Sequence, residues 1–296
     1  MKVSAMDVGI GLPNAVAGTK GEDLIEFARR ADSAGFSSLG TIDRVVYDSY
    51  ESMTALAAAA AVTERIRLMP SILLGPLRTN PALLAKEVAS VHALSGGRFL
   101  LGISVGGRED DYEASGVPMS ERGERIDAFL ETAQRVWAGE RFGAAGGIGP
   151  DVSDDPPEVI IGGGVEASFA RAAKHGIGWI FGGGPPDQFA QGREKAVAAW
   201  KAAGRDGEPR TAALGYFALG PNAEAAAKED LLHYYGWLGD EVAEMVASSA
   251  ATDPETVRER VQAFSDAGCD ELILFATSSD PEQVDLLADA ALSARV

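Results

Sequence analysis

The stretch GEDLIEFARRADSAGFSSLGT, residues 21–41, decides the fold. Its first part repeats apolar residues every three to four positions, which is the spacing of one face of an amphipathic helix. Thr19 and Glu22 have the spacing of a capping box and predict where this helix begins. Gly35 predicts where it ends, because glycine readily adopts the left-handed conformation that stops a helix. The apolar run that follows predicts a parallel strand buried on both faces.

The same junction occurs twice more, at residues 175–177 (HGI) and 267–269 (AGC), with Gly176 and Gly268 as the predicted helix ends. Working outward, hydrophobic periodicity predicts eight strands, at residues 5–11, 37–42, 66–74, 98–104, 158–162, 177–181, 211–218 and 271–275. Helical patterns alternate with them, at residues 21–34, 51–63, 80–94, 120–138, 165–174, 187–203, 222–266 (several helices) and 281–294. This order predicts one α/β domain over residues 1–296, a (β/α)₈ TIM barrel with helical and loop insertions. A doubly wound sheet is the alternative, but residues 12–14 (LPN) do not form its phosphate loop.

Two segments are longer than a barrel needs. Residues 139–157 are rich in Gly, Pro and Asp and predict an irregular loop. Residues 220–252 add helix between the seventh and eighth strands. Barrel enzymes have their sites at the C-terminal ends of the strands, so we expect both insertions on that face, where a lid can cover a site.

Composition excludes several classes of function. The 26 Lys and Arg against 44 Asp and Glu leave a net charge of −18, which repels nucleic acid. One cysteine, Cys269, and three scattered histidines do not have the spacing of a metal site. The longest apolar run, residues 55–62, is too short to span a membrane, and the N-terminus does not resemble a signal peptide. We therefore expect a cytoplasmic protein that binds neither membranes, nucleic acid nor a structural metal.

Polar residues follow the second predicted strand. Asp43 and Arg44 place a carboxylate beside a guanidinium, and Tyr47 comes three residues later. Such a pair orients a polar ring edge or binds an anion, and the alternative is a salt bridge that holds one loop to its neighbour. Of the histidines, His92 and His175 fall at structural positions in helices, while the role of His233 is open.

Glycine-rich turns follow the fourth and fifth strands. Gly106, Gly107 and Arg108 combine a flexible backbone with a cation, and the acidic residues 109–111 after them predict a solvated face. Gly162–Gly164 precede a predicted helix, whose free amides and positive end favour a phosphate. A tight turn between strand and helix is the alternative use of these glycines. Because no nucleophile motif is present, a phosphorylated organic cofactor is the expected source of the chemistry.

Pro70 lies inside the third apolar run, where a proline lacks the amide that pairs with a neighbouring strand. Either a bulge or distortion of the strand, or a position at its edge, accounts for this proline.

A resemblance covers nearly the whole chain. The block LSGGRFLLG at residues 94–102, with NPALLAK at 80–86, ERG at 121–123 and AGCDE at 267–271, resembles the bacterial luciferase-like flavin monooxygenase family, which includes F420-dependent oxidoreductases. The resemblance implies a (β/α)₈ barrel, often a homodimer, that binds reduced FMN or F420 at its C-terminal face. It implies that the cofactor phosphate lies near Gly106, Gly107, Arg108 and Gly162–Gly164. It also implies a cis peptide bond between Ser71 and Ile72 that supports the middle of the ring.

The sequence departs from the family at two positions. Many members have Asp-His or Glu-His after the second strand, whereas this chain has Asp43-Arg44. A histidine proton donor therefore cannot be carried over. The sixth strand commonly opens with Gly-Asp-Gly-Trp, and here residues 176–179 read GIGW, without the acid.

The leading hypothesis is an oxidoreductase or monooxygenase that uses reduced FMN or F420 on a small organic substrate. Asp43, Arg44 and Tyr47 are its candidate catalytic residues, and Tyr112 is a further candidate for contact with the ring. A barrel aldolase or isomerase acting on a phosphorylated substrate is an alternative. It would need a lysine or a Glu pair at strand ends, and the lysines considered, at positions 86, 174, 195 and 201, fall in helical patterns. A non-catalytic ligand-binding subunit is the third possibility.

Overall fold

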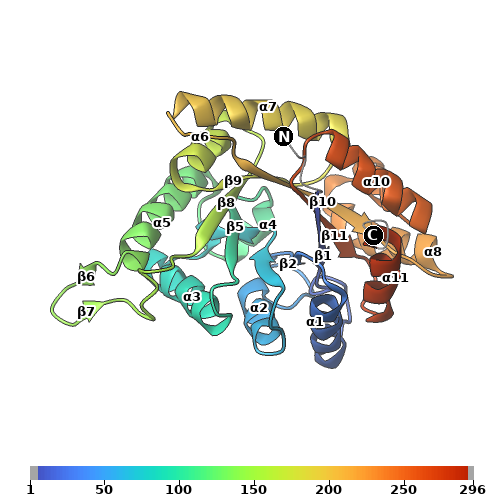
Figure 1. The fold of residues 1–296 in the computed structure, drawn as a ribbon, viewed down its shortest axis with the longest axis horizontal. Coiled ribbons are helices and arrows are strands. Elements are labelled where there is room, and N and C mark those ends of the chain that lie inside the picture. Colours follow the sequence, from blue (N-terminus) through green and yellow to red (C-terminus); the bar gives the residue numbers. More distant parts are fainter. Residues whose placement is uncertain (1–5, 293–296) are drawn as a thin grey trace.

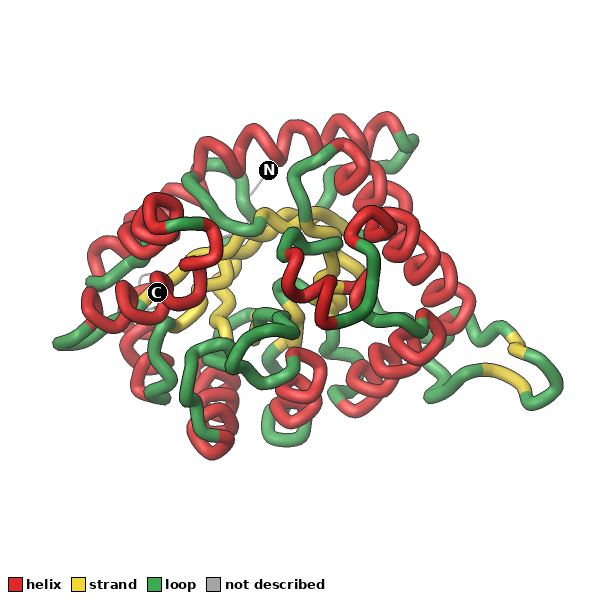
Figure 2. The backbone as a smooth tube through the Cα atoms, turned by 180° about the vertical axis from the view of Figure 1, so that it is seen from behind, coloured by secondary structure: helices red, strands yellow, loops and turns green. Residues whose placement is uncertain are grey.

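Parallel strands occupy the middle of the molecule, and helices surround them (Figures 1 and 2). The computed structural model describes residues 6–292. It confirms the predicted (β/α)₈ barrel with insertions. Residue 5 of the first predicted strand and residues 293 and 294 of the last predicted helix lie outside the described residues.

The strands follow the predicted positions closely. They are β1 (Asp7–Gly11), β2 (Ser38–Thr41), β3 (Arg67–Pro70), β4 (Leu73–Leu74), β5 (Leu100–Ser104), β8 (Glu158–Gly162), β9 (Gly178–Phe181), β10 (Arg210–Phe217) and β11 (Glu271–Ala276). The helices are α1 (Gly21–Ala34), α2 (Ser52–Ala60), α3 (Pro81–Leu94), α4 (Glu109–Ala114), α5 (Arg122–Trp137), α6 (Glu166–His175), α7 (Pro186–Ala202), α8 (Ala223–Tyr235), α9 (Asp240–Ser248), α10 (Pro254–Asp266) and α11 (Glu282–Ala291). Short 3₁₀ turns lie at Gly75–Leu77 (η1), Met119–Glu121 (η2) and Gly236–Leu238 (η3).

The third predicted strand is divided in two. The sheet order is β3-β2-β1-β11-β10-β9-β8-β5-β4. A bridge between Leu68 of β3 and Phe99, the residue before β5, closes the sheet into a barrel. Pro70 ends β3, and the Ser71–Ile72 bond that separates β3 from β4 is cis, as predicted. The proline thus marks a distortion of a strand inside the barrel, which settles the alternative that the sequence left open.

The three predicted helix ends are confirmed, because α1, α6 and α10 end one or two residues before Gly35, Gly176 and Gly268. Gly35 and Gly268 have φ of 90° and 81°, in the predicted left-handed region. The predicted left-handed conformation is wrong for Gly176, whose φ of −106° is extended. Glycine fits there because a β-carbon would lie 2.9 Å from the carbonyl oxygen of Val159.

The predicted capping box is also wrong. The N-cap of α1 is Lys20 and makes no side-chain cap. The Thr19 hydroxyl instead donates to the carbonyl oxygens of Pro13, at 2.9 Å, and Val16, at 2.7 Å. The threonine therefore closes the loop after β1, because its hydroxyl forms hydrogen bonds to two carbonyl oxygens of that loop.

The insertion at residues 139–157 lies on the opposite face from the one predicted. It connects α5 to β8, and a segment between a helix and the next strand lies at the strands' N-terminal ends because the helix has already returned the chain there. It also contains a short antiparallel hairpin, β6 (Arg141–Phe142) and β7 (Gly146–Gly147), that projects beyond the helices (Figures 1 and 2). His92 contacts the C-terminal end of the insertion, where its Nε2 atom lies 2.9 Å from the carbonyl oxygen of Asp155.

The interior of the barrel is filled by side chains from the strands. Met69, Leu100, Ile160, Ile180, Ala212, Ile273 and Phe275 form this inner cluster. The phenyl ring of Phe275 lies over Gly11 and Gly40, where a β-carbon would come within 2.0 Å and 2.9 Å of it. A larger apolar layer lies between strands and helices. No helix within residues 6–292 is long and apolar enough to cross a membrane.

Candidate functional site

The loops after β2 and β5 meet the 220–252 insertion at the C-terminal end of the barrel. The insertion consists of α8, η3 and α9, and it follows β10 directly, so it lies on the face expected for a site. We call α8 and η3, residues 223–238, the lid. Contacts from Arg44, Tyr47 and Arg108, three of the predicted site residues, connect the lid to the barrel.

Asp43 is committed to the loop after β4. Its Oδ2 accepts the amide of Leu74 at 2.8 Å, and its Oδ1 lies 3.1 Å from Nη2 of Arg78. The same guanidinium lies 2.9 Å from Glu51. Burial raises the pKa of Asp43, and the nearby Arg78 opposes this rise. Asp43 and Arg44 therefore have different partners, and the two side chains do not form the predicted pair that would bind one ligand.

Arg44 forms a buried ion pair with a residue that the sequence had placed in solvent. Its Nε lies 3.0 Å from Oδ2 of Asp111, and both side chains are almost fully buried. Oδ1 of Asp111 accepts the amides of Val45, at 2.9 Å, and Val46, at 2.7 Å. The prediction that residues 109–111 form a solvated face is therefore wrong for Asp111. The Nη1 atom of Arg44 is buried without a hydrogen-bond partner in the described part of the chain.

Tyr47 joins the loop after β2 to the lid. Its hydroxyl lies 2.8 Å from Nδ1 of His233, and its ring packs edge-on against Tyr234, 5.1 Å between centroids. Arg44 lies over both tyrosine rings, 5.1 Å and 5.3 Å from their centres. Burial raises the pKa of Tyr47 to about 12, with a contribution from the negative charge of Asp230. Tyr47 is therefore neutral at physiological pH.

Arg108 also contacts the lid. Its guanidinium lies 3.4 Å from the carbonyl oxygen of Tyr234 and 4.3 Å from the ring centre of Trp237. On the other side it pairs with Asp110 at 3.3 Å. The cation that was expected to neutralise a phosphate thus holds the lid in this conformation.

A small apolar cavity lies beneath the lid. It has a volume of about 10 Å³, enough for about one water molecule. Its walls come from the ends of β1, β2, β10 and β11 and from α8, through Leu12, Pro13, Ala15, Val16, Ile42, Tyr216, Asp230, Leu231, Tyr234, Phe275 and Ala276. Burial raises the pKa of Asp230 to about 7. A substrate can enter this space only when the lid moves.

The two glycine turns lie on neighbouring strands, because β5 pairs with β8. A β-carbon at Gly107 or Gly164 would meet nothing within 4 Å, whereas at Gly106 it would lie 2.7 Å from Leu74. Gly163 has φ of 121°, and a β-carbon there would lie 2.4 Å from Oγ of Ser168. Gly164 leads into α6, which has no side-chain cap. The turns therefore present open backbone beside a helix N-terminus.

The cis bond lies next to the second glycine turn. A β-carbon at Gly162 would come within 2.6 Å of Cδ1 of Ile72. The Ser71 amide donates to the carbonyl oxygen of Thr41 at 2.7 Å, which ties this bond to the end of β2. Ser71 and Ile72 thus lie between the β2 loop and the Gly162–Gly164 turn, the position from which they would support a bound ring.

Tyr112 lies in the core beside the site. It packs with Leu74, Leu77 and Val117, and its hydroxyl donates to the carbonyl oxygen of Val105. Burial raises its pKa. Its ring would reach a ligand only through these neighbours.

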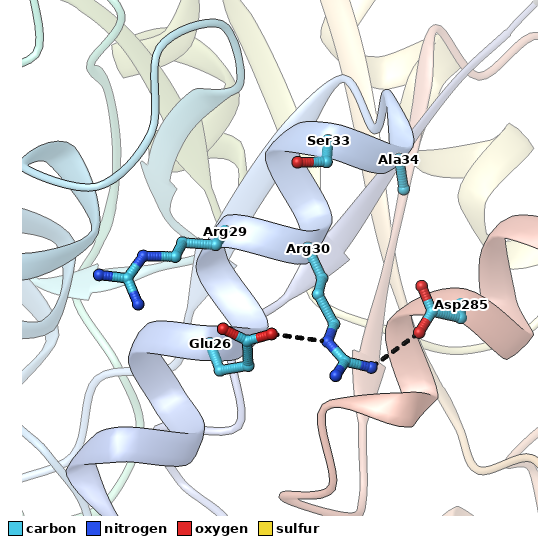
Figure 3. A pocket seen from close by; sticks show the side chains of 6 residues that line it. All are labelled: Glu26, Arg29, Arg30, Ser33, Ala34 and Asp285. Atoms are coloured by element: carbon cyan, nitrogen blue, oxygen red, sulfur yellow. Dashed lines mark hydrogen bonds and ion pairs between the residues drawn. The ribbon is translucent and has the colours of Figure 1, made fainter.

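Larger hollows occur on the outer surface and at the N-terminal face. One of about 450 Å³ lies between α1 and α11, where Arg30 pairs with Glu26 at 3.0 Å and Asp285 at 2.8 Å (Figure 3). Another of about 450 Å³ is lined by the 139–157 insertion and His175. Burial lowers the pKa of His175. Neither hollow brings together the residues at the mouth of the barrel.

Almost the whole chain matches the model of a known protein family. The model described as luciferase-like monooxygenase matches residues 6–289. The chain belongs to the luciferase-like monooxygenase family. This confirms the resemblance drawn from residues 94–102 and the other motifs.

Two relatives of this luciferase-like protein each match a little more than half of this chain. An uncharacterized protein of Mycobacterium tuberculosis is 33% identical over 194 residues, 56% of this chain and 67% of that protein. An F420-dependent glucose-6-phosphate dehydrogenase of Amycolatopsis mediterranei is 26% identical over 173 residues, 52% of each chain. The chain thus spans about half of that dehydrogenase.

Two solved structures share the luciferase-like fold over almost their whole length. An F420-dependent secondary alcohol dehydrogenase, solved with an F420–acetone adduct, has a TM-score of 0.80 at 18% identity, covering 99% of this chain and 100% of its own. The FMN-bound oxygenating constituent of 3,6-diketocamphane monooxygenase from Pseudomonas putida has a TM-score of 0.73 at 18% identity, covering 96% of each. At this identity the likeness concerns the fold alone.

The sequence alone does not reveal the residues that the lid and α4 bring to the mouth. It predicts a solvent-exposed Asp111, whereas that side chain is buried, and it contains no pattern that singles out Asp230. The cluster Tyr234, Tyr235 and Trp237 after His233 was a visible signal, because aromatic residues beside a histidine in an insertion on the site face indicate a lid.

Proposed function

We propose that this luciferase-like protein is an F420-dependent oxidoreductase that transfers hydride between the cofactor and a small carbonyl or alcohol substrate. One observation supports the proposal most directly: two adjacent glycine turns, at residues 106–107 and 162–164, present open backbone beside the uncapped start of α6. Free backbone amides and the positive end of a helix are suited to a phosphate.

The residues at this cradle fit an anionic cofactor tail. Ser168 lies in the first turn of α6, and its Oγ is 2.4 Å from the position that a β-carbon would take at Gly163. Gly107 and Gly164 leave room for an atom to approach their backbone, which any side chain would occupy. Ser71 and Ile72 would support the ring, and the cofactor itself supplies the hydride chemistry when bound.

The lid supplies exclusion of water. Its contacts to Tyr47 and Arg108 leave a cavity of only about 10 Å³ beneath it, so bulk solvent is absent when it is seated. Exclusion of water strengthens the electrostatic interactions inside a site and prevents side reactions of a reduced cofactor.

F420 is favoured over FMN because the dehydrogenase relative and the structure with TM-score 0.80 are both described as F420-dependent. FMN with monooxygenation is the second candidate, since the family description names monooxygenases and the diketocamphane structure contains FMN.

Fluorescence titration with F420 and with FMN tests the proposal. We expect F420 to bind with micromolar or tighter affinity, and Gly107→Ala and Gly164→Ala to weaken this binding at least tenfold without loss of stability, since neither new methyl group meets protein atoms. Gly147→Ala, in the hairpin at the other face, is the matched control. Tight binding of FMN alone would favour the second candidate. If neither cofactor binds, the F420-dependent and the FMN-dependent functions are both refuted. The aldolase or isomerase and the ligand-binding subunit would then be the remaining hypotheses.

The family resemblance also leads us to propose a homodimer. Light scattering should then give twice the 30.8 kDa mass of one chain. A mass of one chain at micromolar concentration would contradict it.

A further inference from the structure

Asp230 lies on the side of the lid that lines the cavity, where an acidic side chain is unexpected. It belongs to the third turn of α8 and lines the apolar cavity at the mouth of the barrel. From the barrel, Leu12, Ile42 and Phe275 face the same space. A carboxylate surrounded by apolar side chains is poorly solvated, so burial favours its neutral form.

The nearby cations are already paired. Arg44 has Asp111 as its partner and Arg108 has Asp110, at 3.0 Å and 3.3 Å. Asp230 makes no hydrogen bond or ion pair within residues 6–292. Its carboxyl is therefore available to a ligand, and no positive charge compensates it.

The other titratable groups around Asp230 do not stabilise its charge. Tyr216 and Tyr234 line the cavity, and Tyr47 and Tyr235 are close enough for the charge of Asp230 to raise their pKa values. Glu229, next in the chain, adds repulsion and raises the pKa of Asp230 further. His233, on the same helix, is engaged by Tyr47.

Resting on the proposed function, we propose that Asp230 is the proton donor and acceptor for the substrate at this site. When a carbonyl group is reduced, the hydride forms the new C–H bond, the C=O π electrons move to oxygen, and the carboxylic acid of Asp230 gives its proton to that oxygen. The products are an alcohol and the Asp230 carboxylate, which regains a proton from solvent when the lid opens. In the reverse direction the carboxylate accepts the hydroxyl proton as hydride leaves.

This assignment fits the absence of a histidine after β2. Position 44 holds an arginine that is committed to Asp111 and does not release a proton near neutral pH. A general acid works best when its pKa lies near the operating pH, and burial brings Asp230 to about 7. The lid thus carries the proton-transfer group and closes the site in one movement.

The test begins on protein without cofactor. Carboxyl ¹³C NMR of aspartate-labelled protein is expected to show one aspartate with a midpoint near pH 7, absent from Asp230→Asn and retained in Glu224→Gln, an exposed control on the same helix. Addition of oxidised F420 should shift this resonance, because the ring covers the same mouth. A midpoint below pH 5, or a resonance unmoved by bound F420, would overturn the assignment.

Binding and turnover complete the experiment. Asp230→Asn is expected to bind F420 within threefold of the wild type, and to lower kcat for cyclohexanone with reduced F420 at least 100-fold with KM within threefold. Unchanged kcat in Asp230→Asn would refute the role of Asp230 while leaving the proposed function intact. If the wild-type protein does not bind F420, the proposed function is refuted. The midpoint of the NMR titration reports on Asp230 independently of cofactor binding.

Discussion

Replacing Asp111 with asparagine should destabilise the protein far more than replacing its neighbour Asp110. The Asp111 carboxylate accepts three hydrogen bonds, from Nε of Arg44 and from the amides of Val45 and Val46. An asparagine keeps one oxygen for the two amides. Its NH₂ group then faces the Arg44 guanidinium, so that a donor meets a donor and a buried positive charge loses its compensation.

The size of the effect follows from burial. Both side chains of the Arg44–Asp111 pair are at most 2% exposed, and breaking a buried pair by removing one partner costs about 3–5 kcal/mol. Because the asparagine oxygen retains the amide bonds, we expect the lower end, about 3 kcal/mol. The Asp110 side chain is 43% exposed, and its pairs with Arg44 and Arg108 are 3.5 Å and 3.3 Å long. Asp110→Asn should therefore cost less than about 1 kcal/mol.

Urea unfolding of the two single variants measures this difference. The double variant Arg44→Met, Asp111→Asn removes both the charge and its partner, and should recover part of the loss, giving a coupling of about 1–3 kcal/mol. An additional 0.5 M NaCl should change the Asp111 effect little, because buried charges are poorly screened. If Asp111→Asn costs no more than Asp110→Asn, or if the double variant is simply additive, the pair does not hold the β2 loop as we have argued.

Three further predictions concern stability and reactivity. Because Asp230 has a pKa of about 7 when folded, above its ordinary 3.8, it binds a proton more tightly in the folded state, and its contribution to stability should fall by about 2–3 kcal/mol as pH rises from 5 to 8. Thermal unfolding of Asp230→Asn should show a smaller fall, and equal falls would contradict this. Burial raises the pKa of Cys269 to about 12, so a thiol reagent should label it only at the rate of unfolding, and immediate labelling of native protein would show otherwise. Gly102→Ala places a methyl group 2.1 Å from the carbonyl oxygen of Pro70 and should destabilise the barrel by about 3 kcal/mol in urea, whereas Gly107→Ala should have almost no effect; equal stabilities would show that β3 and β5 can separate.

Much of the fold was accessible from the sequence because it depends on local patterns. The repeat of an apolar helix face, a glycine and an apolar strand marks three of the helix-to-strand junctions of the barrel, at Gly35, Gly176 and Gly268. The glycines at residues 106–107 and 162–164 were recognisable for the same reason, since a turn between a strand and a helix is a local event. Their partnership, however, required β5 and β8 to be neighbours.

The errors arose where a local pattern had more than one outcome. Thr19 and Glu22 have capping-box spacing, yet the threonine hydroxyl donates to the carbonyl oxygens of two residues in the loop after β1. The insertion at 139–157 was recognised by composition but placed on the wrong face. Its position follows from the direction of α5, which a composition does not encode.

The sequence by itself determined the order of strands and helices and the glycine turns, because each depends on residues adjacent in the chain. Only the tertiary structure decided which charges are paired and which are free. Asp111 and Arg44 are 67 residues apart, and Asp230 is brought to the barrel mouth by an insertion that begins after the seventh strand position. Whether a carboxyl is solvated, paired or isolated depends on what surrounds it in space, and for these residues the surroundings come from distant parts of the chain.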